Sequence, residues 1–199
     1  MRNIIFICFF LIGCAKYNRS EIQSDISIKL TNRSIKDSTD LKIIITNNSL
    51  KNYYLLYSSK SPNDIMKEFN NGDSFYTISA IIGDDENSGP DIVLHDGSCP
   101  LDIITHTTKD ILKLKPKQKV KVSIPFRMKT NISTYCYYEY NTDMMDFNKQ
   151  YYVSANYYIG NEYFKNALSK TVKDSLEQMG YELYGKEIIS NKVPLILKK

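Results

Sequence analysis

The sequence predicts a mainly β protein, an antiparallel β-sandwich with one or two inserted helices. Eight short segments are apolar throughout or alternate between apolar and polar residues, which is the period of a half-buried strand. Asn, Asp, Gly and Pro residues that favour turns separate these segments at short intervals. The chain has 199 residues, of which 42% are hydrophobic, so it is long enough for one domain with a substantial core.

The first strand is expected at 26–30, because three apolar residues alternate there with Ser27 and Lys29. The other strands are expected at 41–46, 53–57, 75–82, 120–128, 134–140, 151–159 and 193–197. The segment 151–159 has the longest alternation. Pro194 cannot donate a hydrogen bond to a neighbouring strand, so we expect the last strand at the edge of a sheet.

Two helices are also expected. A helix of about two turns should follow Ser61, which can cap it, and Pro62, which suits its first turn. A longer helix is expected at about 162–179, between a possible cap at Asn161 and Gly180. Its apolar stripe consists of Phe164, Leu168, Val172, Leu176 and Met179. We interpret this stripe as core packing that covers one face or one end of the sandwich.

The first fourteen residues, MRNIIFICFFLIGC, have the features of an export signal: one basic residue, an apolar run at 4–12 and a small residue after it. Nine helical residues span about 14 Å, which is too short to cross a hydrocarbon core of about 30 Å. Leu11-Ile12-Gly13-Cys14 resembles the lipobox of bacterial lipoproteins. In that family the cysteine thiol receives a diacylglyceryl group, a peptidase cuts before the cysteine, and the new amino group is usually acylated.

The lipobox resemblance implies that residues 1–13 are a signal peptide, residues 14–24 a polar tether and residues 25–199 a single domain. The mature chain would begin at Cys14 and hold 199 − 13 = 186 residues. Two or more acyl chains anchor a protein stably to a bilayer. Ala15 stands where Asp retains lipoproteins in the inner membrane, so the resemblance implies an outer-membrane protein facing the periplasm, if the source has two membranes. The alternative is an ordinary signal peptide with a chance cysteine.

The order of the expected strands adds a second resemblance. A strand ends in Asn-Asn-Ser, an aromatic strand follows, Leu114-Lys-Pro leads into the segment from 120, and Gln150-Tyr-Tyr-Val-Ser-Ala precedes the closing strand. This order resembles the immunoglobulin-like sandwiches of uncharacterised envelope lipoproteins. The resemblance implies that Tyr151 or Tyr152 acts as a tyrosine corner. The tryptophan of antibody domains is missing, since the chain contains no Trp.

Two cysteines remain once Cys8 leaves with the signal peptide and Cys14 carries the lipid. In an exported protein, Cys99 and Cys136 are a candidate disulfide. The bridge would close about 37 residues, and the loop-entropy model gives it a stabilisation of roughly 4 kcal/mol. It would fasten a long loop to an aromatic strand. The alternative is a pair of free thiols.

Two groups of titratable residues have the side chains that metals bind: His95, Asp96, Asp102 and His106, and the acidic run 84–86. Neither group has the spacing of a known metal site, so we interpret both as solvated loops. The sequence also contains no glycine-rich phosphate loop, no nucleophile elbow and no His-Glu-x-x-His pattern. We therefore predict no catalytic residue, no metal and no cofactor.

Sixteen tyrosines are the most unusual feature of the composition. Many lie in the expected strands 134–140 and 151–159, where alternation turns part of each set outward. Outward tyrosines offer a flat, rigid contact surface to a sugar or a protein, so Tyr138 and Tyr158 are binding candidates. The alternative is that the tyrosines serve only as cross-strand pairs.

Together these observations predict a lipid-anchored envelope protein that acts as a non-catalytic binding or structural module. The net charge of +4, from 26 basic and 22 acidic residues, is too balanced to indicate nucleic acid. The expected partners are membrane lipid, through acylated Cys14, and a protein or a glycan. Two alternatives stay open: an inhibitor or carbohydrate-binding accessory that uses the loop around Cys99, and a small enzyme with a site near His95, Asp96 and His106.

Overall fold

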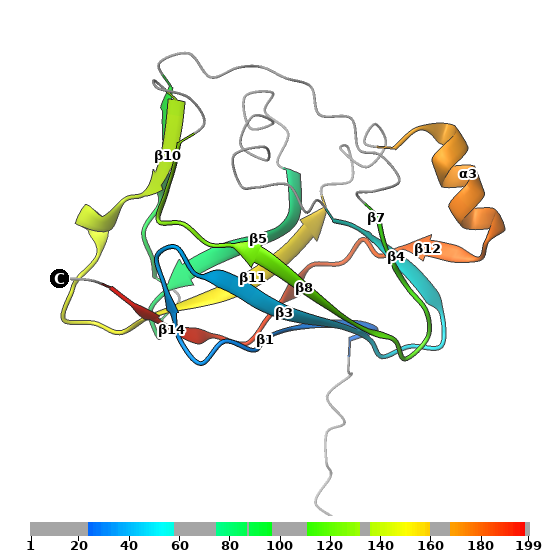
Figure 1. Cartoon of the computed structure of the whole chain (residues 1–199), viewed down its shortest axis with the longest axis horizontal. Coiled ribbons are helices and arrows are strands. Elements are labelled where there is room, and N and C mark those ends of the chain that lie inside the picture. Colours follow the sequence, from blue (N-terminus) through cyan, green and yellow to red (C-terminus); the bar gives the residue numbers. More distant parts are fainter. Residues whose placement is uncertain are drawn as a thin grey trace, which may run out of the picture.

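A computed structural model of the chain describes residues 24–57, 75–86, 88–96, 111–131, 136–159 and 168–197, and this part is mainly β (Figure 1). The strands are β1 (Ile26–Leu30), β2 (Ile35–Lys36), β3 (Asp40–Asn47), β4 (Asn52–Leu56), β5 (Phe75–Gly83), β6 (Ile92–Asp96), β7 (Ile111–Leu114), β8 (Lys119–Pro125), β9 (Lys129–Asn131), β10 (Cys136–Tyr140), β11 (Tyr151–Ile159), β12 (Tyr181–Leu183), β13 (Ile188–Ile189) and β14 (Val193–Ile196). The helices are the 3-10 turn η3 (Thr142–Met144) and α3 (Lys170–Gln178).

The strands β1, β3 and β8 form an antiparallel sheet with β3 in the centre. Their apolar residues point inward and include Ile28, Ile43 and Ile45, all of which are buried. Lysines occupy several of the alternate positions and are exposed. One face of this sheet therefore belongs to the core and the other to solvent.

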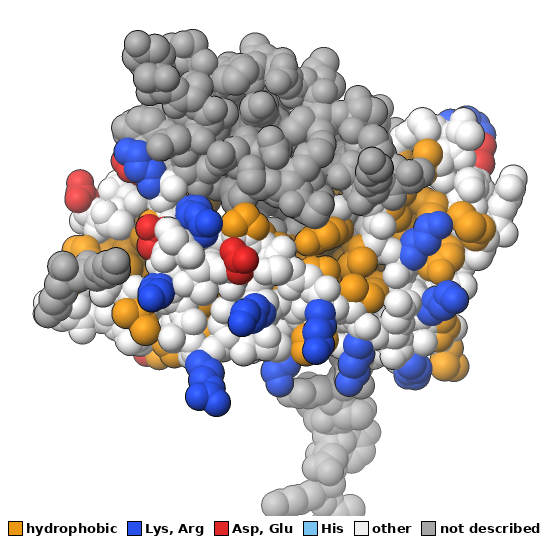
Figure 2. Space-filling model, in the orientation of Figure 1, with side chains coloured by type: hydrophobic (Ala, Val, Ile, Leu, Met, Phe, Trp, Pro, Cys, Tyr) orange, Lys and Arg blue, Asp and Glu red, His pale blue; other side chains and the backbone are white. Residues whose placement is uncertain are grey.

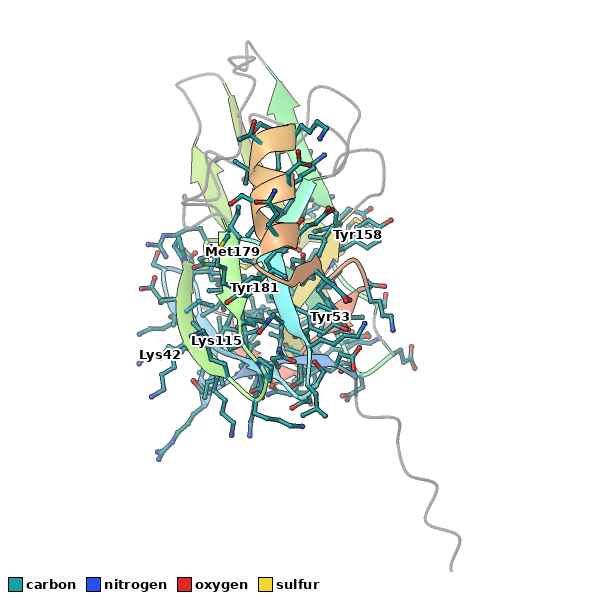
Figure 3. The ribbon with its side chains drawn as sticks, turned by 90° about the vertical axis from the view of Figure 1, so that its right-hand side faces the viewer. Lys42, Tyr53, Lys115, Tyr158, Met179 and Tyr181 are labelled. Atoms are coloured by element: carbon teal, nitrogen blue, oxygen red, sulfur yellow. The ribbon has the colours of Figure 1, made fainter. Side chains whose placement is uncertain are left out.

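A second antiparallel group surrounds β11. On one side β11 pairs with β5, and on the other side it pairs first with β14 and then with β13. The short strand β2 pairs in parallel with β14. Alternate β11 residues are buried, including Tyr157, whose hydroxyl donates to the backbone oxygen of Tyr184 at 3.1 Å. These buried residues join those of the β1–β3–β8 sheet in one hydrophobic cluster, so the two sheets are facing layers (Figures 1 and 3).

The β3–β8 pair and the β4–β7 pair are joined by a bend that both chain segments share. The chain leaves β3 and enters β4 after four residues, while β7 leads into β8 on the partner side. The β4–β7 pair continues the β3–β8 pair, and β12 adds in parallel to β4. Asn47 lies at this bend and is fully buried. Its Nδ2 donates to the backbone oxygens of Lys51, Leu114 and Lys115 at 2.7, 3.2 and 3.0 Å, so one side chain holds both bends.

The strands β6, β10 and β9 form a further antiparallel sheet with β10 in the centre. Its contact with the rest of the fold includes Tyr140, whose ring is buried and lies 6.2 Å from that of Phe126. The Tyr140 hydroxyl donates to the backbone oxygen of Ala80 on β5 at 3.0 Å. This bond links the end of β10 to the edge of the β11 group.

The eight strands expected from the sequence are present, as β1, β3, β4, β5, β8, β10, β11 and β14. The expectation that the last strand is an edge is wrong, because β14 lies between β11 and β2. Pro194 is tolerated there because β2 pairs only with Leu195 and Ile196, the residues after the proline. The expected segment 120–128 ends early, at Pro125.

The long helix is shorter than expected within the described residues. It begins at Lys170, because Ser169 is extended and its side chain accepts the amide of Val172 as an N-cap. Leu168 and Leu176 are buried as expected, but Met179 is the C-cap and is 48% exposed. Gly180 follows with a positive φ of 74°, the usual C-terminal signal. Residues 162–167, with Phe164, and the expected helix after Ser61 lie outside the described residues.

Candidate functional site

The outward side of β11 presents the tyrosine that the sequence singled out. Burial alternates along all nine residues of this strand, and Tyr158 is 42% exposed while Tyr157 beside it is fully buried. Ser154 and Asn156 share the outward side with Tyr158 and are half-buried. The ring of Tyr158 therefore stands on the solvent face of the sheet, next to small polar neighbours.

Two exposed isoleucines from neighbouring strands lie on the same face. Ile81 of β5 is opposite Ser154, and Ile189 of β13 is opposite Asn156, on the other side of β11. Residues opposite each other in an antiparallel pair point to the same face. Ile81 is 41% exposed and Ile189 is 59% exposed. We call this group, Ile81, Ser154, Asn156, Tyr158 and Ile189, the Tyr158 face.

The polar centre of the Tyr158 face is held by the neighbouring loop. Asn156 donates from Nδ2 to the Oε1 of Glu187 at 3.1 Å, while its Oδ1 is buried without a hydrogen-bond partner. Ser190, which follows β13, is buried, and its hydroxyl accepts the amide of Ala155 at 2.8 Å. These bonds fix β13 against β11, so Ile189 has a rigid support.

The same sheet ends in a small hollow near the C-terminal end of β14. The hollow has a volume of about 240 Å³ and is lined by Phe147, Lys149, Gln150, Tyr151, Leu195, Ile196 and Leu197. Phe147 and Ile196 are both more than half exposed, at 52% and 53%. Pro194 lies opposite Tyr152, on the outward side of β11, so Ile196 continues that side beyond it. Apolar surface thus recurs along the sheet from Tyr158 to Phe147.

A buried carboxylate fixes the loop beside this hollow. Asp84 is 4% exposed; its Oδ1 accepts the amides of Glu86 and Ser88, and its Oδ2 accepts the ammonium of Lys149 at 3.1 Å. Burial by itself would raise the pKa of Asp84, but the Ser88 amide and the Lys149 ammonium outweigh it and lower that pKa. The hydrogen bond to Asp84 raises the pKa of Lys149 in turn. The carboxylate of Asp84 therefore stabilises the loop through these hydrogen bonds.

For the other site residues predicted from the sequence, the structure gives a position on a strand, or the residue lies outside the described part of the chain. Tyr138 lies on β10, opposite Leu94 of β6, and hence in a different sheet from Tyr158. His95 and Asp96 end β6, where Asp96 is opposite Cys136. The disulfide between Cys99 and Cys136 stays a prediction, because Cys99 lies outside the described residues. Cys14, Cys99, Asp102 and His106 lie outside the described residues.

The isoleucines of the Tyr158 face were missed in the sequence. Each belongs to a pair, Ile81-Ile82 and Ile188-Ile189, in which strand alternation must turn one member outward. The pair itself was the available signal. The register, which places both outward members on the same face as Tyr158, cannot be read from the sequence.

The Tyr158 face presents one tyrosine and two isoleucines to solvent. Within the described ranges, no three His, Cys, Asp or Glu side chains come together as a metal site would require. In the same part of the chain, no helix has the length and apolar character needed to span a bilayer.

No known protein family model matches the chain. No curated protein matches it either.

Proposed function

We propose that this chain is a lipid-anchored protein of the bacterial envelope, and that its immunoglobulin-like β-sandwich binds another protein through the Tyr158 face. One observation carries the binding role: Ile81, Tyr158 and Ile189, from three neighbouring strands, are exposed on one face of one sheet. Exposed apolar side chains rimmed by polar residues are typical of protein interaction sites. The two facing layers of mainly antiparallel strands support the sandwich.

The chemistry of the face favours a protein over a sugar. A sugar site needs several hydrogen-bonding groups around an aromatic ring. Here the ring of Tyr158 shares its face with two isoleucines, and the Nδ2 of Asn156 already donates to Glu187. Rigid, branched apolar side chains beside an aromatic anchor suit the apolar surface of a protein partner. The proposed role is non-catalytic, since this face holds no acid, base or nucleophile arranged for a reaction.

The lipid anchor gives a prediction about one sulfur atom. Cells that express the chain with radiolabelled palmitate should label it, and Cys14→Ser should remove the label and release the protein from the membrane fraction, because the acylated thiol is lost. Cys8→Ser is the matched control within the same leader and should keep both. Label that survives in Cys14→Ser, or a mature amino terminus elsewhere, would contradict the anchor.

The proposed binding face predicts which positions of the chain can be cross-linked to a partner. A photoreactive residue placed at 158 or at 189 should yield one cross-linked adduct of the same mass in living cells, because both side chains would meet the same partner. Ile81→Lys, an exposed substitution on the same face, should abolish both adducts with less than about 0.5 kcal/mol change in stability. The control position is Lys170 on α3. Equal adducts from position 170, or adducts that survive Ile81→Lys, would count against the face.

A sugar ligand is the second candidate, and the exposed ring of Tyr158 is the observation that favours it. Its test is a glycan array with the parent chain, Tyr158→Ala and Tyr138→Ala. Binding that is lost in Tyr158→Ala would favour a carbohydrate-binding accessory. An array without binding by the parent would remove this candidate.

A further inference from the structure

The outer face of the β1–β3–β8 sheet is basic. Its exposed lysines are Lys29, Lys42, Lys119 and Lys121, which we call the lysine face. Lysine and arginine side chains are gathered along this side of the molecule, over β3 and β8 (Figure 2). Of the ten outward positions of the three strands, four are lysine and one, Asp40 at the start of β3, is acidic.

Register brings these lysines close together. Lys29 of β1 and Lys121 of β8 both lie opposite Ile44 of β3, so about two strand spacings, roughly 10 Å, separate them. Lys42 is the next outward residue along β3, and Lys119 lies opposite Thr46. The ion pairs of the described residues do not include any of the four. The face therefore carries concentrated positive charge with little internal neutralisation.

Protection of the sheet edges does not explain all four lysines. Lys42 and Lys121 are diagonal neighbours on adjacent strands, so their like charges do not stabilise the pairing of β3 with β8. Lysines on edge strands can prevent aggregation, which would account for those of β1 and β8 but not for Lys42 on the central strand. A face of this kind is electrostatically complementary to a flat surface that carries many negative charges.

We propose that the lysine face lies on the anionic surface of the membrane to which the protein is attached. This inference rests on the proposed lipid anchor. The described chain begins at Ser24 and runs directly into β1, an edge strand of the same sheet. Cys14 lies ten residues before Ser24, a span of at most about 35 Å. The sequence of that segment contains two further basic residues, Lys16 and Arg19.

The placement also orients the Tyr158 face. Lys42 and Tyr158 lie on opposite sides of the molecule in the edge-on view (Figure 3). If the lysine face contacts lipid headgroups, the Tyr158 face points away from the bilayer and is open to a protein partner. The two layers then have separate tasks, one toward lipid and one toward protein.

The test measures charge-dependent binding in a chain without the acyl anchor. Full-length Cys14→Ser protein is mixed with vesicles of phosphatidylcholine, with and without phosphatidylglycerol. The apolar residues 4–12 contribute equally to every variant, so the increase caused by phosphatidylglycerol isolates the lysine face. Each lysine near an anionic surface is worth about fivefold in affinity. Lys42→Gln with Lys121→Gln should reduce the increase about 25-fold, and salt of about 1 M should remove it.

The matched control removes two exposed lysines elsewhere, Lys170→Gln on α3 and Lys186→Gln in the loop before β13. It has the same net charge as the first pair and should keep nearly the whole increase. Equal losses in both pairs, or no phosphatidylglycerol effect in the parent, would overturn the inference. Thermal unfolding checks that both pairs stay folded. Palmitate labelling at Cys14 is a separate experiment, so failure of the anchor and failure of the lysine face are distinguishable.

Discussion

Asn47→Asp is expected to destabilise the fold by about 3–5 kcal/mol, a large share of the 5–15 kcal/mol typical of a domain. The change keeps the shape of the side chain but removes the amide hydrogens that bind the backbone oxygens of Lys51, Leu114 and Lys115. A carboxylate oxygen would then face three carbonyl oxygens in a site without solvent. The amide and hydroxyl of Ser49 would still donate to one oxygen of residue 47, but the other oxygen would lack a donor, each of the three carbonyls would lose one, and a buried charge without a counter-ion is costly.

The measurement is urea unfolding followed by circular dichroism. Asn148→Asp is the control, because Asn148 is an exposed turn residue and the chemical change is the same. It should alter the free energy of unfolding by less than about 0.5 kcal/mol. The deficit of Asn47→Asp should also shrink as the pH falls, since a protonated carboxyl can donate one of the lost bonds. Similar stabilities of the two variants at neutral pH would show that Asn47 does not hold the bend.

The strands were predictable from the sequence where the alternation of apolar and polar residues within one segment is sufficient to identify them. The alternation of Ile26–Leu30 and Tyr151–Ile159 gave both the element and the buried side correctly. Tyr158 was identified as outward for the same reason. These features depend on local period alone, which the sequence displays directly.

Features that depend on a partner strand were not predictable. The strand β2 has two residues and exists only because β14 pairs with it, which also makes β14 internal. The helix boundary failed for another reason: Asn161 and Ser169 can both serve as caps, and the stripe through Leu168 spans the second. Local propensity cannot choose between two possible caps when tertiary packing decides.

The candidate site shows the same division. Its tyrosine follows from the period of one strand, but Ile81 and Ile189 join it through pairings between β11, β5 and β13 that span many residues of sequence. The lysine face is a parallel case. Lys29, Lys42 and Lys121 are scattered in the sequence, and the register of β1, β3 and β8 gathers them. Surface sites built across strands need register, which the sequence does not state.

Gly89→Ala is expected to be the other severe substitution. A Cβ at Gly89 would lie 2.0 Å from the backbone oxygen of Ile82 and 2.8 Å from its carbonyl carbon. Both atoms belong to the main chain of β5, so no side-chain rotation can relieve the contact. Either the loop or the end of β5 must move, at a cost of about 3 kcal/mol.

Gly185→Ala is the matched control, because a Cβ there meets no atom within 4 Å. It should leave the free energy of unfolding nearly unchanged, or raise it slightly through the unfolded chain. Amide hydrogen exchange separates local from global effects. In Gly89→Ala the loss of protection should begin at Asp84 and Lys149, whose bond crosses from the displaced loop to the hollow. The Tyr158 end of β11 should stay protected, because Ser190 holds it from the other side. Uniform loss along β11 would mean that the loop and the sheet unfold as one unit.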